Sequence, residues 1–431
     1  MDFKSKRGFL KVKRLLTIFL VLSIMIFATI SAGAVTIEMQ AMGNAPTELH
    51  KNWMEEKIAE FKEQTGIDVV FNQIAWGEEM QRIPLALTTG EGANVMQVGT
   101  TQNPFFAGTG GLLQIDLDEF GGEEAYMPAN LKSTKLKGVS YGVPWFAETR
   151  VLFYNTEMFE AAGISNPPQT WDELMEVGQQ IVETHGEGSA IAIAGTSAWD
   201  LIHNWAIMLW SRGGNMLNED NTEARFNSEA GVEAMKYYVD LVDEGLASEA
   251  SAEYNQPQVD AAFINGDVAM AVMGPWNIAD INDENPDLPY SVAEPPAGPE
   301  GRAAFSGGSN LVIRANAPQE EIEASKKWVK FLTSDEVLID YTKNLTNMLP
   351  AKSSAFDDPY YETEKMKVFN EALSYATAYP PLVEWAEIEQ AIVNNYNNIL
   401  TDYVDGNYDE NTAEEYLDSA ADQVDTILNE N

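Results

Sequence analysis

The sequence predicts an α/β fold in two domains, and three observations lead to this prediction. Strand-like and helix-like segments alternate along the chain, which is typical of layered α/β proteins. The 431 residues exceed the size that a single hydrophobic core usually serves. The chain has no cysteine, so we expect cores that are large enough to be stable without disulfides.

The first elements predict a parallel, doubly wound sheet. The segment TIEMQAM at 36–42 alternates as a strand, and 52–66 carries apolar residues at helical spacing before it ends at a glycine. A second strand at 67–74, a helix that closes at 80–92 and a short buried strand at 94–99 follow. Strands that alternate with helices in this way usually pair in parallel.

Helical patterns become more frequent toward the C-terminus. Thr170 and Glu173 have the spacing of a capping box at the start of a helix. The segment 317–334 has an apolar helical stripe that includes Trp328. The C-terminal third is mostly helical in pattern, with a period of 3.6 residues at 387–406 and 413–429.

The N-terminus has the three-part form of a secretory signal. The first fourteen residues carry six basic side chains and one acid, and residues 15–30 are uncharged and apolar. Ala32 and Ala34 fit the small-residue pattern of a cleavage site, so we expect removal of residues 1–34 and a periplasmic protein. The alternative is an uncleaved anchor, although this apolar run is shorter than the ~20 residues of a membrane-spanning helix. Without a cysteine, the protein is not expected to be a lipoprotein.

The composition argues against several classes of function. The chain holds 67 acidic and 26 basic side chains, a formal net charge of −41, and such a surface repels nucleic acid. Its three histidines, His50, His185 and His203, do not have the spacing of a metal site. Without cysteine there is no thiolate nucleophile and no cysteine-ligated metal. We therefore expect no metal and no cofactor.

Aromatic and polar side chains gather at the ends of predicted strands, where open α/β sheets bind ligands. One strand runs into Gly274-Pro275-Trp276, a second into a polar loop with Gln102 and Asn103, and an extended segment carries Trp145 and Glu148. Indole rings pack on the C–H faces of a sugar, while amides and carboxylates bind its hydroxyls. These residue types therefore predict a neutral carbohydrate ligand. The other candidate ligand contacts are Asn44, Trp76, His203, Trp205, Ser309 and Asn310.

Each candidate also has a purely structural interpretation. Trp276 is expected to face a ligand because Gly-Pro ends the strand just before it. Glu148 could instead pair with Arg150, which we interpret as structural, and His203 is expected to be a pocket wall or an interior residue rather than a catalyst. The tryptophans expected in the core are Trp53, Trp171 and Trp328.

Two longer segments resemble a known family. YGVPWFAETRVLFYNTEMFEAAGISNPPQTWDEL (141–174) and FINGDVAMAVMGPWN (263–277) are similar to the family 1 extracellular solute-binding proteins of ABC importers, which include maltose- and trehalose/maltose-binding proteins. Shorter motifs keep the order of that family over essentially the whole chain after residue 34. The resemblance implies a type II periplasmic-binding-protein-like fold, in which two discontinuous α/β lobes hold the ligand between them.

The resemblance also implies where the lobes begin and end. The chain is expected to cross between them near 146–151, 293–296 and 332–336. The expected first lobe is then 35–147 plus 297–333, and the expected second lobe is 148–296 plus 334–431.

The resemblance carries ligand contacts onto particular residues. Glu148, Trp276 and Trp385 fall where maltose-binding protein has a ligand-contacting glutamate and two tryptophans that stack on the sugar. Gln102 and Asn103 fall where that relative holds sugar hydroxyls with an aspartate and an arginine.

The chain also departs from that pattern. Gly99 falls where the relative has another aromatic residue, and we expect Trp145 or Trp76 to take its place. Glu389 stands where the relative has an arginine. These departures argue against maltose itself rather than against a sugar.

The sequence thus predicts the solute-binding component of an ABC importer. We expect a monomer, with no catalytic residues, that captures a di- or oligosaccharide by hinge closure and delivers it to permease subunits in the membrane. No GxxxxGK[ST] motif occurs, so the ATPase would be a separate chain. The alternatives are a secreted glycoside hydrolase and a binding protein for a polyol or glycerol phosphate. A third alternative keeps the fold but changes the output, so that the closed protein signals to a chemoreceptor.

Overall fold

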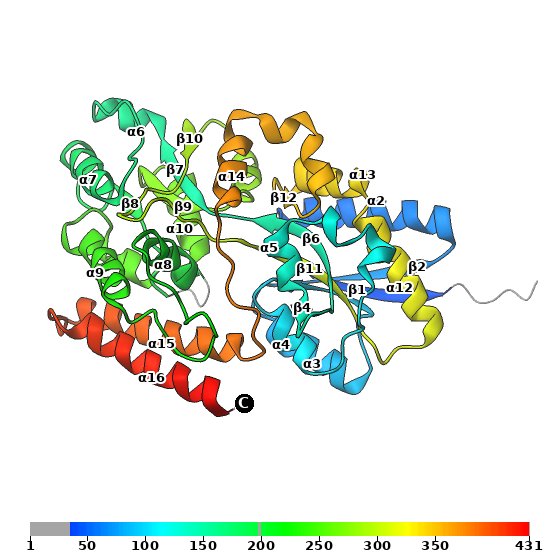
Figure 1. Ribbon diagram of the computed structural model, residues 1–431. Helices are drawn as coiled ribbons and strands as arrows, with labels where there is room; N and C mark the ends of the chain where they lie inside the picture. Colours follow the sequence, from blue (N-terminus) through cyan, green and yellow to red (C-terminus); the bar gives the residue numbers. More distant parts are fainter. Residues whose placement is uncertain (1–34, 197–199, 431) are drawn as a thin grey trace, which may run out of the picture.

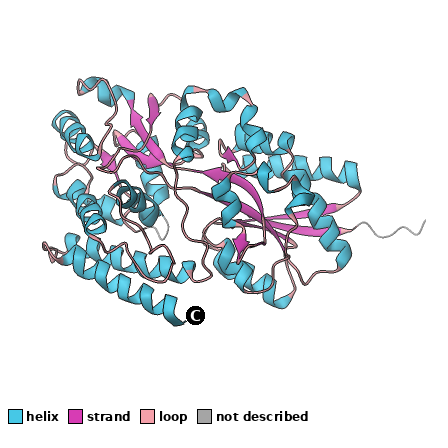
Figure 2. Cartoon of the chain, viewed as in Figure 1, coloured by secondary structure: helices cyan, strands magenta, loops and turns pink. Residues whose placement is uncertain are grey.

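The computed structural model describes residues 35–196 and 200–430 and shows two α/β units side by side (Figure 1). The first is built on a six-stranded sheet with the order β12-β6-β11-β3-β1-β2, and the second on a four-stranded sheet with the order β10-β7-β9-β8. We call these the first sheet and the second sheet. Helices flank both, and the last part of the chain is helical, so the predicted α/β fold is confirmed (Figure 2).

The first sheet contains the parallel strands predicted near the N-terminus. β1 (Thr36–Met42) pairs in parallel with β2 (Asp68–Ile74) and with β3 (Val95–Gly99). β11 (Gly307–Ile313) is antiparallel to β3 and to β6 (Val143–Glu148), so β6 points the same way as the first three strands. The carboxyl ends of four strands therefore meet at one edge of the sheet, beside the start of β11.

The first sheet packs against three long helices. α2 (Thr47–Thr65) ends at Gly66 in the left-handed conformation that glycine tolerates, and α12 (Gln319–Leu332) places Trp328 in the core, as predicted. The Trp328 ring meets Phe61 edge-on with 4.9 Å between ring centroids. The third long helix is α3 (Glu79–Thr89). The smaller elements of this unit are α4 (Asn103–Gly108), η1 (Leu117–Phe120), η2 (Glu123–Ala125), α5 (Pro128–Ser133), β4 (Lys135–Leu136), β5 (Val139–Ser140), α13 (Asp335–Ile339) and the π-helix η4 (Asp340–Leu345).

The second sheet uses strands from the middle of the chain. β9 (Met270–Met273) is parallel to β8 (Ile191–Ala192) and antiparallel to β7 (Val151–Asn155), which also pairs with β10 (Tyr290–Ala293). The helices around it are α6 (Thr156–Ala161), α7 (Trp171–His185), α8 (Asp200–Ser211), α9 (Glu229–Asp243), η3 (Glu249–Glu253), α10 (Gln256–Ile264), α11 (Asn277–Glu284), α14 (Glu364–Ser374), α15 (Trp385–Val404) and α16 (Thr412–Glu430).

Local signals and packing agree over much of this unit. Thr170 caps α7, because its hydroxyl accepts a hydrogen bond from the backbone N–H of Glu173 at 3.1 Å, at the predicted capping box. Trp171 is buried in the core, as predicted.

Trp53, in the first unit, was also expected in the core, but it is only half-buried. Its Nε1 reaches outward and donates to Asp340 at 2.9 Å.

The chain passes from the first sheet to the second through two residues and returns through a longer segment. β6 ends at Glu148 and β7 begins at Val151, within the range predicted for the first crossing. The return was predicted near 293–296, with 297–333 in the first lobe. That boundary is wrong for 297–305, because Ala297 bridges Thr170 and Phe305 packs in the core of the second unit.

The third crossing also lies further along the chain than predicted. Residues 334–350 were expected in the second lobe, but Leu338 and Tyr341 are fully buried in the core of the first unit. β12 (Leu349–Pro350) then pairs with β6 of the first sheet. The prediction of a crossing at 332–336 is therefore wrong, and the chain crosses between β12 and α14.

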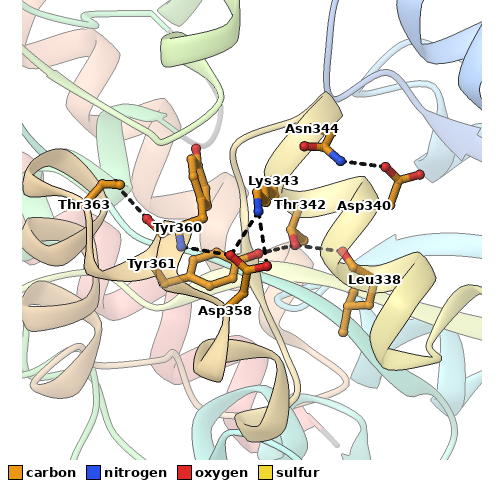
Figure 3. Close-up of polar contacts among 9 residues, drawn as sticks. All are labelled: Leu338, Asp340, Thr342, Lys343, Asn344, Asp358, Tyr360, Tyr361 and Thr363. Carbon is orange, nitrogen blue, oxygen red and sulfur yellow. Dashed lines mark hydrogen bonds and ion pairs between the residues drawn. The ribbon is translucent and has the colours of Figure 1, made fainter.

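Figure 3 shows the contacts that tie this third crossing to the π-helix η4. Lys343 Nζ lies 3.1 and 3.2 Å from the two carboxylate oxygens of Asp358. The hydroxyls of Thr342 and Tyr361 are 2.6 Å apart, and Tyr361 is fully buried in the core of the second unit. The short helices η5 (Ser353–Asp357) and η6 (Pro359–Glu362) complete the segment. The crossing is thus fastened to both units.

Residues 1–34, which carry the predicted signal and cleavage site, lie outside the described residues. Within the part of the chain that the structure describes, no helix has both the length and the apolar character needed to cross a membrane.

Candidate ligand-binding pocket

A cavity of about 390 Å³ lies between the two sheets. Its first wall comes from the residues that follow β1, β2, β3 and β6, and from the start of β11. Its second wall comes from Trp276, which lies between β9 and α11, and from the N-terminal parts of α8, α10 and α11. The cavity, which we call the pocket, therefore occupies the carboxyl ends of parallel strands, where α/β sheets bind ligands.

The first wall offers amides and one exposed indole. Asn44 follows β1, and its Nδ2 donates to the hydroxyl of Tyr341 at 2.9 Å. Trp76 follows β2, is 42% exposed and donates from Nε1 to the carbonyl of Gly43 at 3.1 Å. Gln102 lies beyond β3 with its carbonyl oxygen Oε1 buried and without a partner. The aromatic surface expected in place of one at Gly99 is therefore available at Trp76.

Two glycines allow close packing within the first wall. A Cβ atom on Gly99 would collide with the side-chain amide of Gln102, so the glycine lets that side chain fold back against the strand. Gly308 has φ of 126°, and a Cβ there would strike the carbonyl oxygen of Phe146 on the neighbouring strand. Gly308 is therefore closed to larger residues, because its φ is positive and the atom that a Cβ would strike belongs to the backbone.

The second wall presents Trp276, which follows β9 after Gly274 and Pro275. The indole is half-buried and lies back over Gly274, where a Cβ would overlap the ring. The guanidinium carbon of Arg150 is 5.6 Å from the ring centroid, a cation–π contact. Trp276 also packs against apolar residues of the first unit, so it reaches across from the second sheet. Its position between the units is that of a pocket wall.

The first crossing supplies the charged centre of the pocket. Arg150 is only 4% exposed, and its Nη2 lies 2.5 Å from Oδ1 of Asp200 at the start of α8. Nη1 donates to Oδ1 of Asn204 at 3.4 Å. The structure therefore gives Arg150 an ion pair with Asp200, whereas the sequence suggested Glu148. One oxygen of Glu148, Oε2, is buried without a partner.

Burial changes the ionisation of the pocket carboxyls. Desolvation raises the pKa of Glu148 to about 7, although nearby Arg150 opposes the rise. Desolvation also raises the pKa of Asp260 to about 7 and that of Asp280 to about 6. The pKa of His203 is held well below its usual value by burial and by Arg150, so its imidazole is neutral at pH 7.

His203 connects the pocket to an aromatic cluster behind it. Its ring stacks on Phe305 with 4.0 Å between centroids, and its Nδ1 is 2.9 Å from the hydroxyl of Tyr379. Tyr379 stacks in turn on Trp385 at 4.6 Å. His203 lines the pocket, which fits the prediction of a hydrogen-bonding wall, while its role in binding stays a prediction.

Six of the twelve residues predicted to contact a ligand line the pocket, and six do not. Those that line it are Asn44, Trp76, Gln102, Glu148, His203 and Trp276. The others are almost fully buried in the protein interior: Asn103, Trp145, Trp205, Ser309, Asn310 and Trp385.

The three buried tryptophans pack against aromatic neighbours. Trp145 stacks on Tyr341 at 4.4 Å, because successive strand residues face opposite sides and its neighbours Phe146 and Glu148 take the pocket side of β6. Trp205 lies in the middle of α8, edge-on to Tyr396. Trp385 is fully buried behind Tyr379, so the expected stacking platform is absent from the pocket in this structure.

The three buried polar residues have internal hydrogen bonds. Asn103 Nδ2 donates to the carbonyl of Thr134 at 3.3 Å. Ser309 accepts from Gln97 at 2.9 Å, and Asn310 Nδ2 donates to the hydroxyl of Ser133 at the same distance. These interactions hold the strands and loops of the first unit rather than face the pocket.

Sequence reasoning missed the acidic side of the pocket. Asp200, Asp260 and Asp280 come from the N-terminal parts of three helices, and Gln256 begins α10. These positions lie near helix starts rather than at the strand ends, where ligand contacts were expected. One signal was available in YNQPQVD, where Asn255 and Gln258 form a capping box that marks the start of α10.

Two discontinuous α/β units with a pocket between them define a ligand-binding protein of the type II periplasmic class. Residues 46–338 match the family described as bacterial extracellular solute-binding protein, and the chain belongs to that family.

Relatives and solved structures cover most of the chain. A putative binding protein of Brucella abortus is 29% identical over 340 residues, covering 78% of this chain and 82% of the relative. The diacetylchitobiose-binding protein of Streptomyces coelicolor is 25% identical over 81% of this chain and 80% of its own length. A solute-binding protein of Thermotoga lettingae bound with α-D-tagatose has a TM-score of 0.81 and 27% identity, covering 92% of this chain and 100% of that one.

Proposed function

We propose that this protein is the extracytoplasmic component of an ABC importer and that it captures a carbohydrate in the pocket between its two units. The observation that carries the proposal is the pocket itself, where two indoles, Trp76 and Trp276, flank amides and carboxylates. Indoles pack on pyranose C–H faces, and polar groups of this kind bind hydroxyls. Family membership and the named ligands of several relatives support the same conclusion.

The proposed mechanism is capture by closure of two lobes. The first lobe would comprise the elements on the first sheet, including α13 and β12, and the second lobe those on the second sheet. A ligand that touches Trp76 on one side and Trp276 on the other gains both sets of contacts only when the lobes are together. Binding would therefore shift the population toward the closed form, which then docks on the permease subunits. We propose that the protein is exported, acts as a monomer and delivers its ligand unchanged.

Glycerol phosphate fits the pocket less well than a sugar. Arg150 is the single lining side chain with a fixed positive charge among the described residues, and Asp200 already pairs with it. A phosphate would also face the carboxylates of Asp260 and Asp280, which repel it.

A thermal-shift screen tests the proposal. The purified protein is heated with mono-, di- and oligosaccharides, with polyols, and with glycerol phosphate and amino acids as decoys. A ligand at 100 times its Kd should stabilise the folded form by about 2.7 kcal/mol. A shift with a sugar supports the proposal, whereas shifts with the charged decoys alone would refute it.

A secreted glycoside hydrolase is the second candidate, and one observation favours it. The pKa of Glu148 is raised to about 7 by burial, as a general acid requires. Prolonged incubation of the protein with the sugar that binds, followed by chromatography, should show no cleavage. Turnover that disappears in Glu148→Gln would replace the binding function with hydrolysis.

A further inference from the structure

Acidic side chains outnumber basic ones in the pocket. Four carboxyl side chains line it: Glu148, Asp200, Asp260 and Asp280. Arg150 is the one fixed positive charge among the described lining residues, and Asp200 lies 2.5 Å from it. The other three carboxyls have no ion pair of this kind with a basic side chain of the described residues.

Among the buried polar atoms of the pocket that lack a hydrogen-bond partner, acceptors outnumber donors. Gln102 and Gln256 are 5% and 4% exposed, and the carbonyl oxygen Oε1 of each is buried without a partner. Oε2 of Glu148 is likewise buried without a hydrogen-bond partner. Among the described lining residues, the single buried donor without a partner is Nε of Arg150. A ligand that satisfies these atoms must bring mainly N–H or O–H donors.

Three of the acceptor side chains, Gln256, Asp260 and Asp280, come from the second wall of the pocket. Gln256 and Asp260 lie one turn apart on α10, where Gln256 Nε2 donates to Oδ1 of Asp260 at 2.7 Å and leaves its own Oε1 free. Asp280 extends from the neighbouring helix α11. No group of three or more His, Asp or Glu side chains within residues 35–196 and 200–430 is arranged to hold a metal ion. An organic ammonium group brings three donors and one positive charge, which complements these acceptors and carboxyls.

We propose that the pocket selects a sugar that carries a protonated amino group, which binds beside Asp260, Asp280 and Gln256 while the indoles hold the ring. This inference rests on the carbohydrate function proposed above. It narrows the substrate class from sugars in general to amino sugars with a free amine.

Matched sugars test the proposal by titration calorimetry in a buffer without amines. Each pair differs only by amino groups in place of hydroxyls: glucosamine with glucose and galactosamine with galactose differ at one position, and chitobiose with cellobiose differs at two. Diacetylchitobiose has the same skeleton as chitobiose with its amines acetylated, and spermidine supplies amines without a sugar. At least one amino sugar should bind ten or more times tighter than its neutral partner, and acetylation should remove that advantage.

Each contrary result has a distinct meaning. A neutral sugar that binds as tightly as its amino partner would refute the amino-sugar inference and leave the carbohydrate function standing. A panel in which no amino sugar binds would likewise refute the amino-sugar inference alone. Spermidine that binds while no sugar of either kind does would contradict both proposals.

Two variants locate the amine in the pocket. Asp260→Asn should reduce the ratio of amino-sugar to neutral-sugar affinity at least fivefold, because it removes a charge and keeps the shape. Asp283→Asn is the matched control, since Asp283 is exposed on α11 and does not line the pocket. An equal loss in the two variants would mean that only the overall negative charge attracts the sugar, and the proposed amine site would be wrong. The unfolding temperature of each variant shows whether it is folded.

Discussion

Trp276 and Trp385 were both predicted to stack on a ligand, and the structure separates them. Trp385 is fully buried and stacked on Tyr379, whereas Trp276 is half-buried at the pocket. Replacing a fully buried Trp with alanine costs about 3–5 kcal/mol of the free energy of unfolding. Trp276 has roughly half as much area to lose, so we expect Trp276→Ala to cost no more than about 2 kcal/mol, including its contact with Arg150.

Urea unfolding followed by far-ultraviolet circular dichroism measures both values without relying on the removed indoles. Trp328→Ala is the core control and should match Trp385→Ala, because both side chains are fully buried. Trp276→Ala should instead weaken sugar binding by about 1–3 kcal/mol. The reasoning fails if Trp276→Ala destabilises the protein as much as Trp385→Ala, or if Trp385→Ala leaves stability unchanged and abolishes binding.

Three further predictions concern the backbone, the ionisation of the pocket and the third crossing. Gly308→Ala should lower the free energy of unfolding by more than about 1 kcal/mol, since its positive φ and the nearby carbonyl of Phe146 exclude a Cβ; thermal unfolding measures this. The raised pKa of Glu148 means that the folded state holds this proton more tightly than the unfolded state, so stability falls as pH rises from about 4.5 to 7. The free energy of unfolding of Glu148→Gln should therefore rise relative to that of wild type by up to about 3 kcal/mol across that interval. Urea titrations at pH 5 and 7.5 measure this difference between the two proteins, and a difference that does not change with pH would contradict the raised pKa. Thr342→Val should cost about 1–2 kcal/mol in urea unfolding because it leaves the buried hydroxyl of Tyr361 unpaired, and Thr342→Ser should restore most of the loss.

Local sequence patterns were enough to predict the parallel strands of the first unit and the position of Trp276. Alternation and helical spacing identify the strands up to β3, and the Gly-Pro pair marks where β9 stops. These signals depend on residues that are neighbours along the chain, which explains why they held.

The failures depend on contacts between distant segments. Trp145 and Trp385 are buried because Tyr341 and Tyr379 cover them, and no local pattern reports those partners. Residues 334–350 stay with the first unit because Leu338 and Tyr341 find space in its core. Asp260 joins the pocket only because α10 packs beside β9.

The first crossing is only two residues long, and one of them is Arg150. Its guanidinium lies against both Asp200 and the Trp276 ring, and Glu148 beside it also lines the pocket. Under the proposed closure, the pivot and the recognition surface are the same piece of chain. Selection for a new ligand at this wall would therefore alter how easily the protein opens, so specificity and release rate are constrained to evolve together.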